Sequence, residues 1–245
     1  MKLTRMRKLS LLVASALAVP VAAMGPAGAQ TQQPVSGQVV MTVHSHSAGT
    51  LQFPVDRLPF NFTTGDTFGY SSRTCAGNAP FNDIGLNFTP NYPGVDTGPT
   101  SAARVRHGVT GTIVAAAGNR GVVQGTIQTV LCVRDAGGNW VASGNVLVSH
   151  FTAAYTLVNE NDLHLYGGWQ FSPTESTGVF RDIQGGGRIE ARFTCLGALS
   201  CATGGEWNDF VASTGDPTLP AGQLQPGMTG VFFDPTPGPI AGPVS

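Results

Sequence analysis

The sequence predicts an all-β domain in which an antiparallel meander closes into a barrel of roughly eight strands. No segment of helical length after residue 30 shows a 3.6-residue apolar period. β-Branched and aromatic residues instead fill short alternating runs that are bounded by Gly, Asn and Pro. From Gly108 onward these runs are joined by short turns, and a meander with one apolar side must close on itself or pack on a second sheet.

Residues 1–29 have the features of an export signal. Lys2, Arg5, Arg7 and Lys8 precede an apolar stretch over 9–21, and the small residues 27–29 form a cleavage site. We therefore expect a mature chain that starts at Gln30 and is secreted, either to the periplasm or to the cell exterior. The alternative is an uncleaved N-terminal anchor. No later stretch approaches the roughly 20 apolar residues of a membrane-spanning helix.

The expected β domain covers residues 30–215. Its first strand spans 38–45, and residues 47–108 form a loop-rich insert with short strands near 51–55 and 84–88. A loop region of this length is often functional. The meander follows, with expected strands over 109–117, 122–133, 146–158, 163–171, 179–183 and 188–195. Residues 216–245 are rich in Pro and Gly and are expected to form a flexible tail.

The four cysteines of the mature chain are expected to form disulfides, because an exported protein with an even number of cysteines usually does. We favour Cys195–Cys201, which closes a short loop, and Cys75–Cys132, which ties the insert to a strand. Metal ligation is the weaker alternative, since the sequence has no Cys-x-x-Cys pair.

The charge of the mature chain argues against nucleic acid as a partner. After residue 29 the sequence holds nine arginines, no lysine and fourteen acidic residues, a net charge of −5. Binding to phosphates requires a basic surface. The absence of lysine from the mature chain also excludes Schiff-base catalysis by one of its own lysines.

One segment of the meander resembles a known family. Residues 175–185 read Glu-Ser-Thr-Gly-Val-Phe-Arg-Asp-Ile-Gln-Gly. This is similar to the turn with a Thr-Gly-x-Phe core in the allene oxide cyclase and dirigent-like barrel superfamily, and the resemblance extends over 109–194. It implies an eight-stranded barrel that binds a hydrophobic small molecule in an apolar lumen and steers its cyclisation or coupling. The first strand carries Thr42, His44 and His46 where plant cyclases have a catalytic carboxylate.

Candidate acid/base residues are His164, Tyr166, Tyr155 and His44. His164 and Tyr166 share one face of their strand, opposite Leu163 and Leu165. If this polar face lines a barrel, His164, Tyr166 and Tyr155 form an acid/base set. If the leucines line it, His164 and Tyr166 are exposed, and this is the arrangement we favour.

Trp169, Phe193 and Arg192 are the candidate ligand contacts. Trp169 and Phe193 suit a cavity wall, and Arg192 suits a clamp on a carboxylate. For Arg188, Glu190 and Arg192 we favour an outer charged ladder over an inward apolar face, and the clamp is the alternative.

Three functions stay open. The first is a secreted barrel that binds a small hydrophobic molecule, with isomerase or cyclase activity as an extension and no cofactor. The second is a non-catalytic structural or adhesion protein, in keeping with the absence of any assembled catalytic motif. The third is a metal-dependent enzyme built on His44 and His46, which lie one residue apart on a strand.

Overall fold

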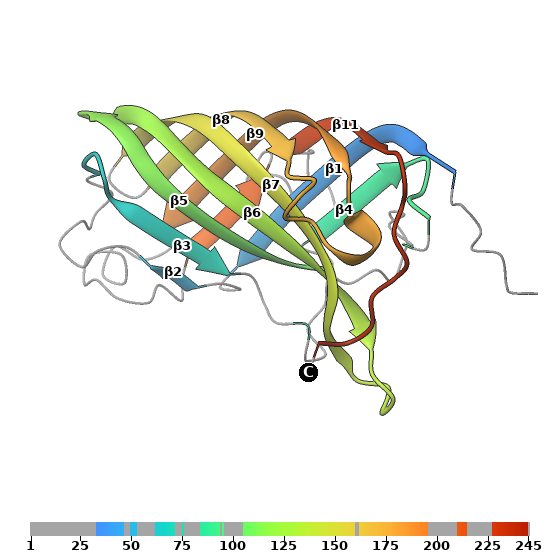
Figure 1. The fold of residues 1–245 in the computed structure, drawn as a ribbon. Helices are drawn as coiled ribbons and strands as arrows, with labels where there is room; N and C mark the ends of the chain where they lie inside the picture. Colours follow the sequence, from blue (N-terminus) through green and yellow to red (C-terminus); the bar gives the residue numbers. More distant parts are fainter. Residues whose placement is uncertain are drawn as a thin grey trace, which may run out of the picture. The chain divides into compact units, whose positions relative to one another are not determined.

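The computed structural model describes residues 33–46, 50–52, 62–71, 75, 84–93, 95, 105–159, 162–195, 210–214 and 227–244. All of them belong to one unit, Gln32–Ser245. The described part is all-β, and its one helical element is the short 3₁₀ helix η2 (Gly178–Phe180). Figure 1 shows the strands as one curled sheet.

The centre of the sheet is the predicted meander. Each strand pairs antiparallel with the next one along the chain, as confirmed by the registers. The strands are β5 (Val105–Ala117), β6 (Arg120–Arg134), β7 (Trp140–Asn159), β8 (Asp162–Phe171) and β9 (Gln184–Cys195).

Strands from both ends of the chain continue the curl beyond β9. The N-terminal half of β9 pairs with β11 (Met228–Asp234), and its C-terminal half pairs with β10 (Phe210–Thr214). These two strands therefore share one position in the sheet. Both pair with β1 (Val35–His46), whose other edge pairs with β4 (Ile84–Thr89). Strand β4 in turn contacts β5. Eight antiparallel positions thus form a curled half-barrel, which confirms the predicted fold class.

The loop-rich insert contributes more strands than the sequence indicated. The expected strand near 84–88 is β4, and β2 (Thr50–Gln52) overlaps the expected strand at 51–55. Strand β3 (Thr67–Ser71) was not expected, and it pairs with β2 on one side and with β5 on the other. The disulfide Cys75–Cys132 is formed and ties the insert to β6, as predicted. Cys201, and with it the predicted Cys195–Cys201 bond, lies outside the described residues.

Two expectations about the C-terminal third need correction. Residues 228–234 fall in the expected tail but form β11, because their alternation buries Met228 and Phe232. This short strand was not predicted because Pro and Gly residues flank it on both sides. The strand expected over 179–183 is absent, since Gly178 and Asp182 both have a positive φ and the chain turns through η2 instead.

The last residues of the chain are fastened to a bulge in β7. Between Val146 and Ala142 the β6–β7 register shifts, and the fully buried Asn145 lies in this irregularity. Its Nδ2 donates to the carbonyl of Ala241 (2.8 Å), and its Oδ1 accepts from the amides of Ala241 (2.7 Å) and Val179 (3.1 Å). One amide side chain therefore holds both η2 and the C-terminal segment against the sheet.

Candidate functional site

The two faces of β8 separate the predicted acid/base residues. Leu163 and Leu165 are buried, whereas His164 and Tyr166 are exposed on the outer face. Tyr155 of β7 lies opposite Leu165 and is 1% exposed, so it is an inner-face residue. The structure therefore does not bring Tyr155 together with His164 and Tyr166, in agreement with the exposed arrangement favoured above.

Other predicted residues are placed by their backbone register alone. His44 pairs with Ser213 of β10, and its side chain lies outside the described set, as does that of His46. Arg192 occupies the position opposite the exposed His164, and Phe193 the position opposite the buried Leu163. Arg188 and Glu190 are exposed while Ile189 and Ala191 are buried, as the charged-ladder interpretation of β9 expects.

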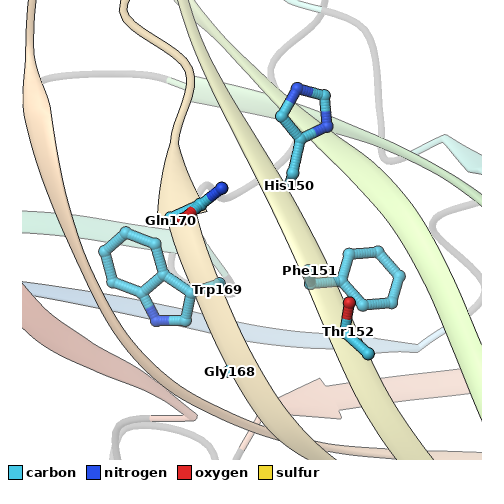
Figure 2. A pocket seen from close by; sticks show the side chains of 6 residues that line it. All are labelled: His150, Phe151, Thr152, Gly168, Trp169 and Gln170. Carbon is cyan, nitrogen blue, oxygen red and sulfur yellow. The ribbon is translucent and has the colours of Figure 1, made fainter.

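A shallow pocket of about 460 Å³ lies over β7 and β8. It is lined by His150, Phe151 and Thr152 of β7 and by Gly168, Trp169 and Gln170 of β8. Figure 2 shows that the polar side chains belong to His150, Thr152 and Gln170, while Gly168 contributes none. Thr152 is the direct cross-strand partner of Gly168, so the missing side chain leaves a hollow on the outer face.

Two histidine–glutamate pairs flank this outer face. His150 Nε2 contacts Glu175 Oε2, and His150 Nδ1 lies 3.1 Å from Thr126 Oγ1. Hydrogen bonds from Ser172 and from His150 lower the pKa of Glu175, so this carboxylate stays ionised. His164 Nε2 lies 3.1 Å from Glu190 Oε1. Each glutamate fixes the orientation of an exposed imidazole.

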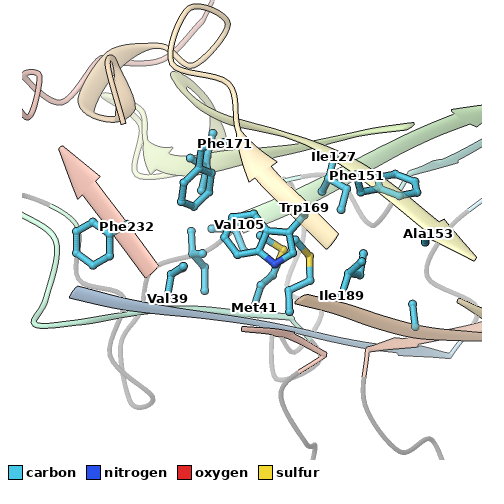
Figure 3. Packing of buried hydrophobic residues seen from close by; sticks show 14 of the residues in the cluster. Val39, Met41, Val105, Ile127, Phe151, Ala153, Trp169, Phe171, Ile189 and Phe232 are labelled. Carbon is cyan, nitrogen blue, oxygen red and sulfur yellow. The ribbon is translucent and has the colours of Figure 1, made fainter. Parts of the chain in front are cut away.

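The inner face is apolar and holds large aromatic rings. Figure 3 shows side chains from β6, β7 and β8 meeting those of β1 and β9 in the interior. Three rings lie over glycines, since a Cβ at Gly125 would contact the Phe151 ring, one at Gly121 the Tyr155 ring, and one at Gly230 the Trp169 ring. The predicted wall residue Trp169 is therefore an interior residue, and its Nε1 donates to the carbonyl of Arg188 (2.9 Å).

Two hydroxyl groups on the inner face of β7 have no hydrogen-bond partner within the described part of the chain. They are Ser149 Oγ and Tyr155 Oη, and both residues are 1% exposed. The Tyr155 ring packs edge-on against Phe62, with centroids 5.3 Å apart. Burial and the nearby charge of Asp66 raise the pKa of Tyr155, so its hydroxyl keeps its proton and is available as a donor.

A third interior group, which was not predicted from the sequence, involves His107. The Thr129 hydroxyl is hydrogen-bonded to His107 Nδ1 (2.8 Å) and lies 4.0 Å from Met41 Sδ. Burial lowers the pKa of His107 from 6.5 to about 4, so the imidazole is neutral. From the sequence alone, a histidine in an alternating strand can be either exposed or buried. Only the register of the strand shows that His107 points inward.

One end of the interior is closed by an aromatic cluster of Phe88, Tyr92, Phe180 and Phe232. The Tyr92 hydroxyl contacts Asp234 Oδ2 and the carbonyl of Val179, and both Tyr92 and Asp234 are fully buried. Burial raises the pKa of Asp234 above its ordinary value. This end of the half-barrel is therefore sealed by packed side chains.

Within the described residues, no group of three or more His, Cys, Asp or Glu side chains is placed to hold a metal ion. The His44–His46 metal hypothesis concerns side chains outside that set and stays a prediction. In the same part of the chain, no helix is both long and apolar enough to cross a membrane.

Comparison with known proteins finds no family model that matches this chain, and no curated protein or solved structure that matches it significantly.

Proposed function

We propose that this protein binds one small, mainly apolar molecule inside the half-barrel. Eight-stranded barrels have interiors just wide enough for packed side chains or one small ligand. Ligand pockets combine apolar and aromatic walls with a few polar groups that fix orientation. The inner face of β7 offers this combination, with Phe151 and Ala153 between Ser149 and Tyr155.

The observation that carries the proposal is the Tyr155 hydroxyl. Buried polar groups are nearly always hydrogen-bonded, so each exception requires an explanation. An unpaired buried hydroxyl costs about 1–3 kcal/mol. A bound molecule with a carbonyl, ether or hydroxyl oxygen would accept from Tyr155 and remove this cost.

The raised pKa of the Tyr155 hydroxyl favours a role in binding over a role in catalysis. A phenol whose pKa is raised keeps its proton, so it stays a hydrogen-bond donor but gives up the proton poorly. Tyr155 is therefore suited to orienting a ligand or polarising its oxygen. Isomerase or cyclase activity, as in the resembling superfamily, would be an extension of this role, with the cavity acting as the mould.

The test is a titration with prodan, an apolar fluorophore that carries one ketone and shifts its emission to the blue in apolar sites. The wild-type protein is expected to bind prodan saturably. The Tyr155→Phe variant keeps the ring packed on Phe62 and Gly121 but lacks the donor, so we expect affinity about three- to tenfold weaker.

Two controls make the result specific. Tyr166→Phe removes a hydroxyl from an exposed ring on the outer face and should leave prodan affinity unchanged. Pyrene, which has no acceptor, should bind wild type and Tyr155→Phe equally. Absence of saturable prodan binding, or equal affinity of wild type and Tyr155→Phe for prodan, would refute the proposal.

A further inference from the structure

The outer face of β8 carries a row of side chains that the lumen does not use. Alternation along the strand places His164, Tyr166, Gly168 and Gln170 on this face, over about 20 Å of strand. The neighbouring strands flank the row with polar residues, namely His150 and Thr152 of β7 and Arg188 and Glu190 of β9.

Tyr166 is the aromatic member of the row, and it is 54% exposed. Its direct cross-strand neighbours are Ala154 and Glu190, and alanine is too small to cover the ring. Tyrosine combines an apolar face with a polar tip, which makes it a frequent contact residue at binding surfaces. The ring is therefore a platform open to a ligand that has both an apolar face and hydroxyl groups.

Next to this platform lies the hollow at Gly168. The pocket of about 460 Å³ falls within the range typical of small-molecule sites. A Cβ built on Gly168 would meet just one neighbouring atom, the carbonyl oxygen of Gly187 at 3.6 Å. The glycine is thus not required by crowding, in contrast to Gly167, where a Cβ would lie 2.1 Å from the carbonyl oxygen of Thr152.

The polar groups that line the hollow or lie beside the row mix donors, acceptors and both signs of charge. Arg188 donates, Glu190 and Glu175 accept, and Gln170, Thr152 and the imidazoles do both. A phosphate or sulfate ligand would call for clustered cations, and a fatty chain for a continuous apolar patch. A ligand with neutral hydroxyl groups, which both donate and accept hydrogen bonds, matches this mixture of donors and acceptors best.

Two imidazoles are held in place before any ligand arrives, that of His164 at one end of the row and that of His150 beside Gln170 at the other. His164 is bound to Glu190 (3.1 Å) and His150 to Glu175, and Thr126 also contacts His150. Prior ordering lowers the entropic cost of binding. We propose that a neutral saccharide chain binds along the outer face of β8, with one ring stacked on Tyr166 and the next seated over Gly168.

The experiment is affinity electrophoresis of the full-length mature protein through native gels. Separate gels contain hydroxyethyl cellulose, laminarin, xylan, mannan or glycol chitin, and a further gel contains dextran sulfate. We expect at least one neutral polysaccharide to retard the wild-type protein. Tyr166→Ala and Gly168→Ala should each weaken this interaction at least about tenfold, and Tyr166→Phe should stay within about twofold of wild type.

The matched control is Phe233→Ala, which removes another partly exposed ring from the outer face but at β11. It should be retarded like wild type, and circular dichroism should show all variants folded. The proposal is overturned if no neutral polysaccharide retards the protein, if dextran sulfate alone does, or if Tyr166→Ala and Gly168→Ala bind like wild type. Prodan binding uses different residues and is expected to survive both substitutions.

Discussion

At the scale of single residues, close approach between aromatic rings and glycines shapes the interior. Phe151 lies directly opposite Gly125, and Tyr155 directly opposite Gly121. A glycine has no Cβ, so each ring can lie over the neighbouring strand and fill the space left there. Glycine in a strand ordinarily weakens it, and the overlying ring compensates for the missing side chain.

We predict that Gly125→Ala destabilises the fold by about 1–3 kcal/mol, the usual cost of overpacking. The new Cβ would lie 2.2 Å from the Thr110 carbonyl oxygen and 2.6 Å from the Phe151 ring. Urea unfolding followed by circular dichroism measures the effect. Gly168→Ala is the matched control, and it should change stability by less than about 0.5 kcal/mol. Equal stabilities for the two variants would show that the ring does not cover Gly125.

His107 predicts a specific dependence of stability on pH. Its pKa is 6.5 in the unfolded chain and about 4 in the folded protein, because burial disfavours the charged form. As the pH falls from 6.5 toward 4, the unfolded chain takes up the proton first. The contribution to stability is therefore complete above pH 6.5 and is lost at up to about 1.4 kcal/mol per pH unit below it.

The His107→Gln variant retains a side chain that can hydrogen-bond Thr129 but does not titrate. Urea unfolding at a series of pH values between 4 and 7 should show a shallower decline for this variant than for the wild-type protein. Parallel curves for the two proteins would mean that His107 is accessible to solvent in the fold.

At the scale of elements, alternation along the chain predicted the meander because one face of each strand is buried and the other exposed. Strand β8 is the clearest example, with Leu163 and Leu165 inside and His164 and Tyr166 outside. Strand β11 was missed because seven residues between Pro- and Gly-rich segments carry little periodic signal. Its place in the sheet depends on pairing with β1 and β9, which are distant in sequence.

The candidate sites were predicted less well for a related reason. Which residues meet across a sheet depends on register, and a shift of one residue exchanges the two faces. Tyr155 and His164 were grouped as candidate residues, but the register of β7 and β8 places them on opposite faces of the sheet. The contacts of Asn145 and Asp234 arise from irregular backbone and from loops, for which the sequence offers no periodicity.

The fastening of the C-terminal segment leads to a prediction for Asn145. Replacement by alanine leaves the amides of Ala241 and Val179 and the Ala241 carbonyl without their partner. We expect Asn145→Ala to lower the free energy of unfolding by about 3 kcal/mol. Hydrogen exchange at the amides of Ala241 and Val244 should accelerate.

The control for this prediction is Asn119→Ala, which removes an exposed turn amide whose contact with the Leu157 carbonyl is 3.4 Å long. It should change stability by less than about 0.5 kcal/mol and leave exchange at the C-terminus unaltered. Unchanged protection of Ala241 in Asn145→Ala would show that other contacts hold the segment.

At the scale of the whole molecule, the half-barrel separates two chemistries onto its two faces. The inner face is apolar and is sealed at one end by the cluster around Tyr92. Among the described residues, it holds two β7 hydroxyls that are buried without a hydrogen-bond partner. The outer face of β8 is polar around one exposed ring and one hollow. The first suits a small apolar ligand and the second a hydroxyl-rich one, so the two proposals can be tested independently.

Native mass spectrometry can detect a small apolar ligand inside the half-barrel directly. The protein is purified without a tag and measured before and after extraction with mild organic solvent. We expect an excess mass equivalent to one small molecule, which extraction removes and which Tyr155→Phe retains to a lesser extent. A mass equal to that of the disulfide-bonded chain before and after extraction, in a protein that also fails to take up prodan, would contradict it.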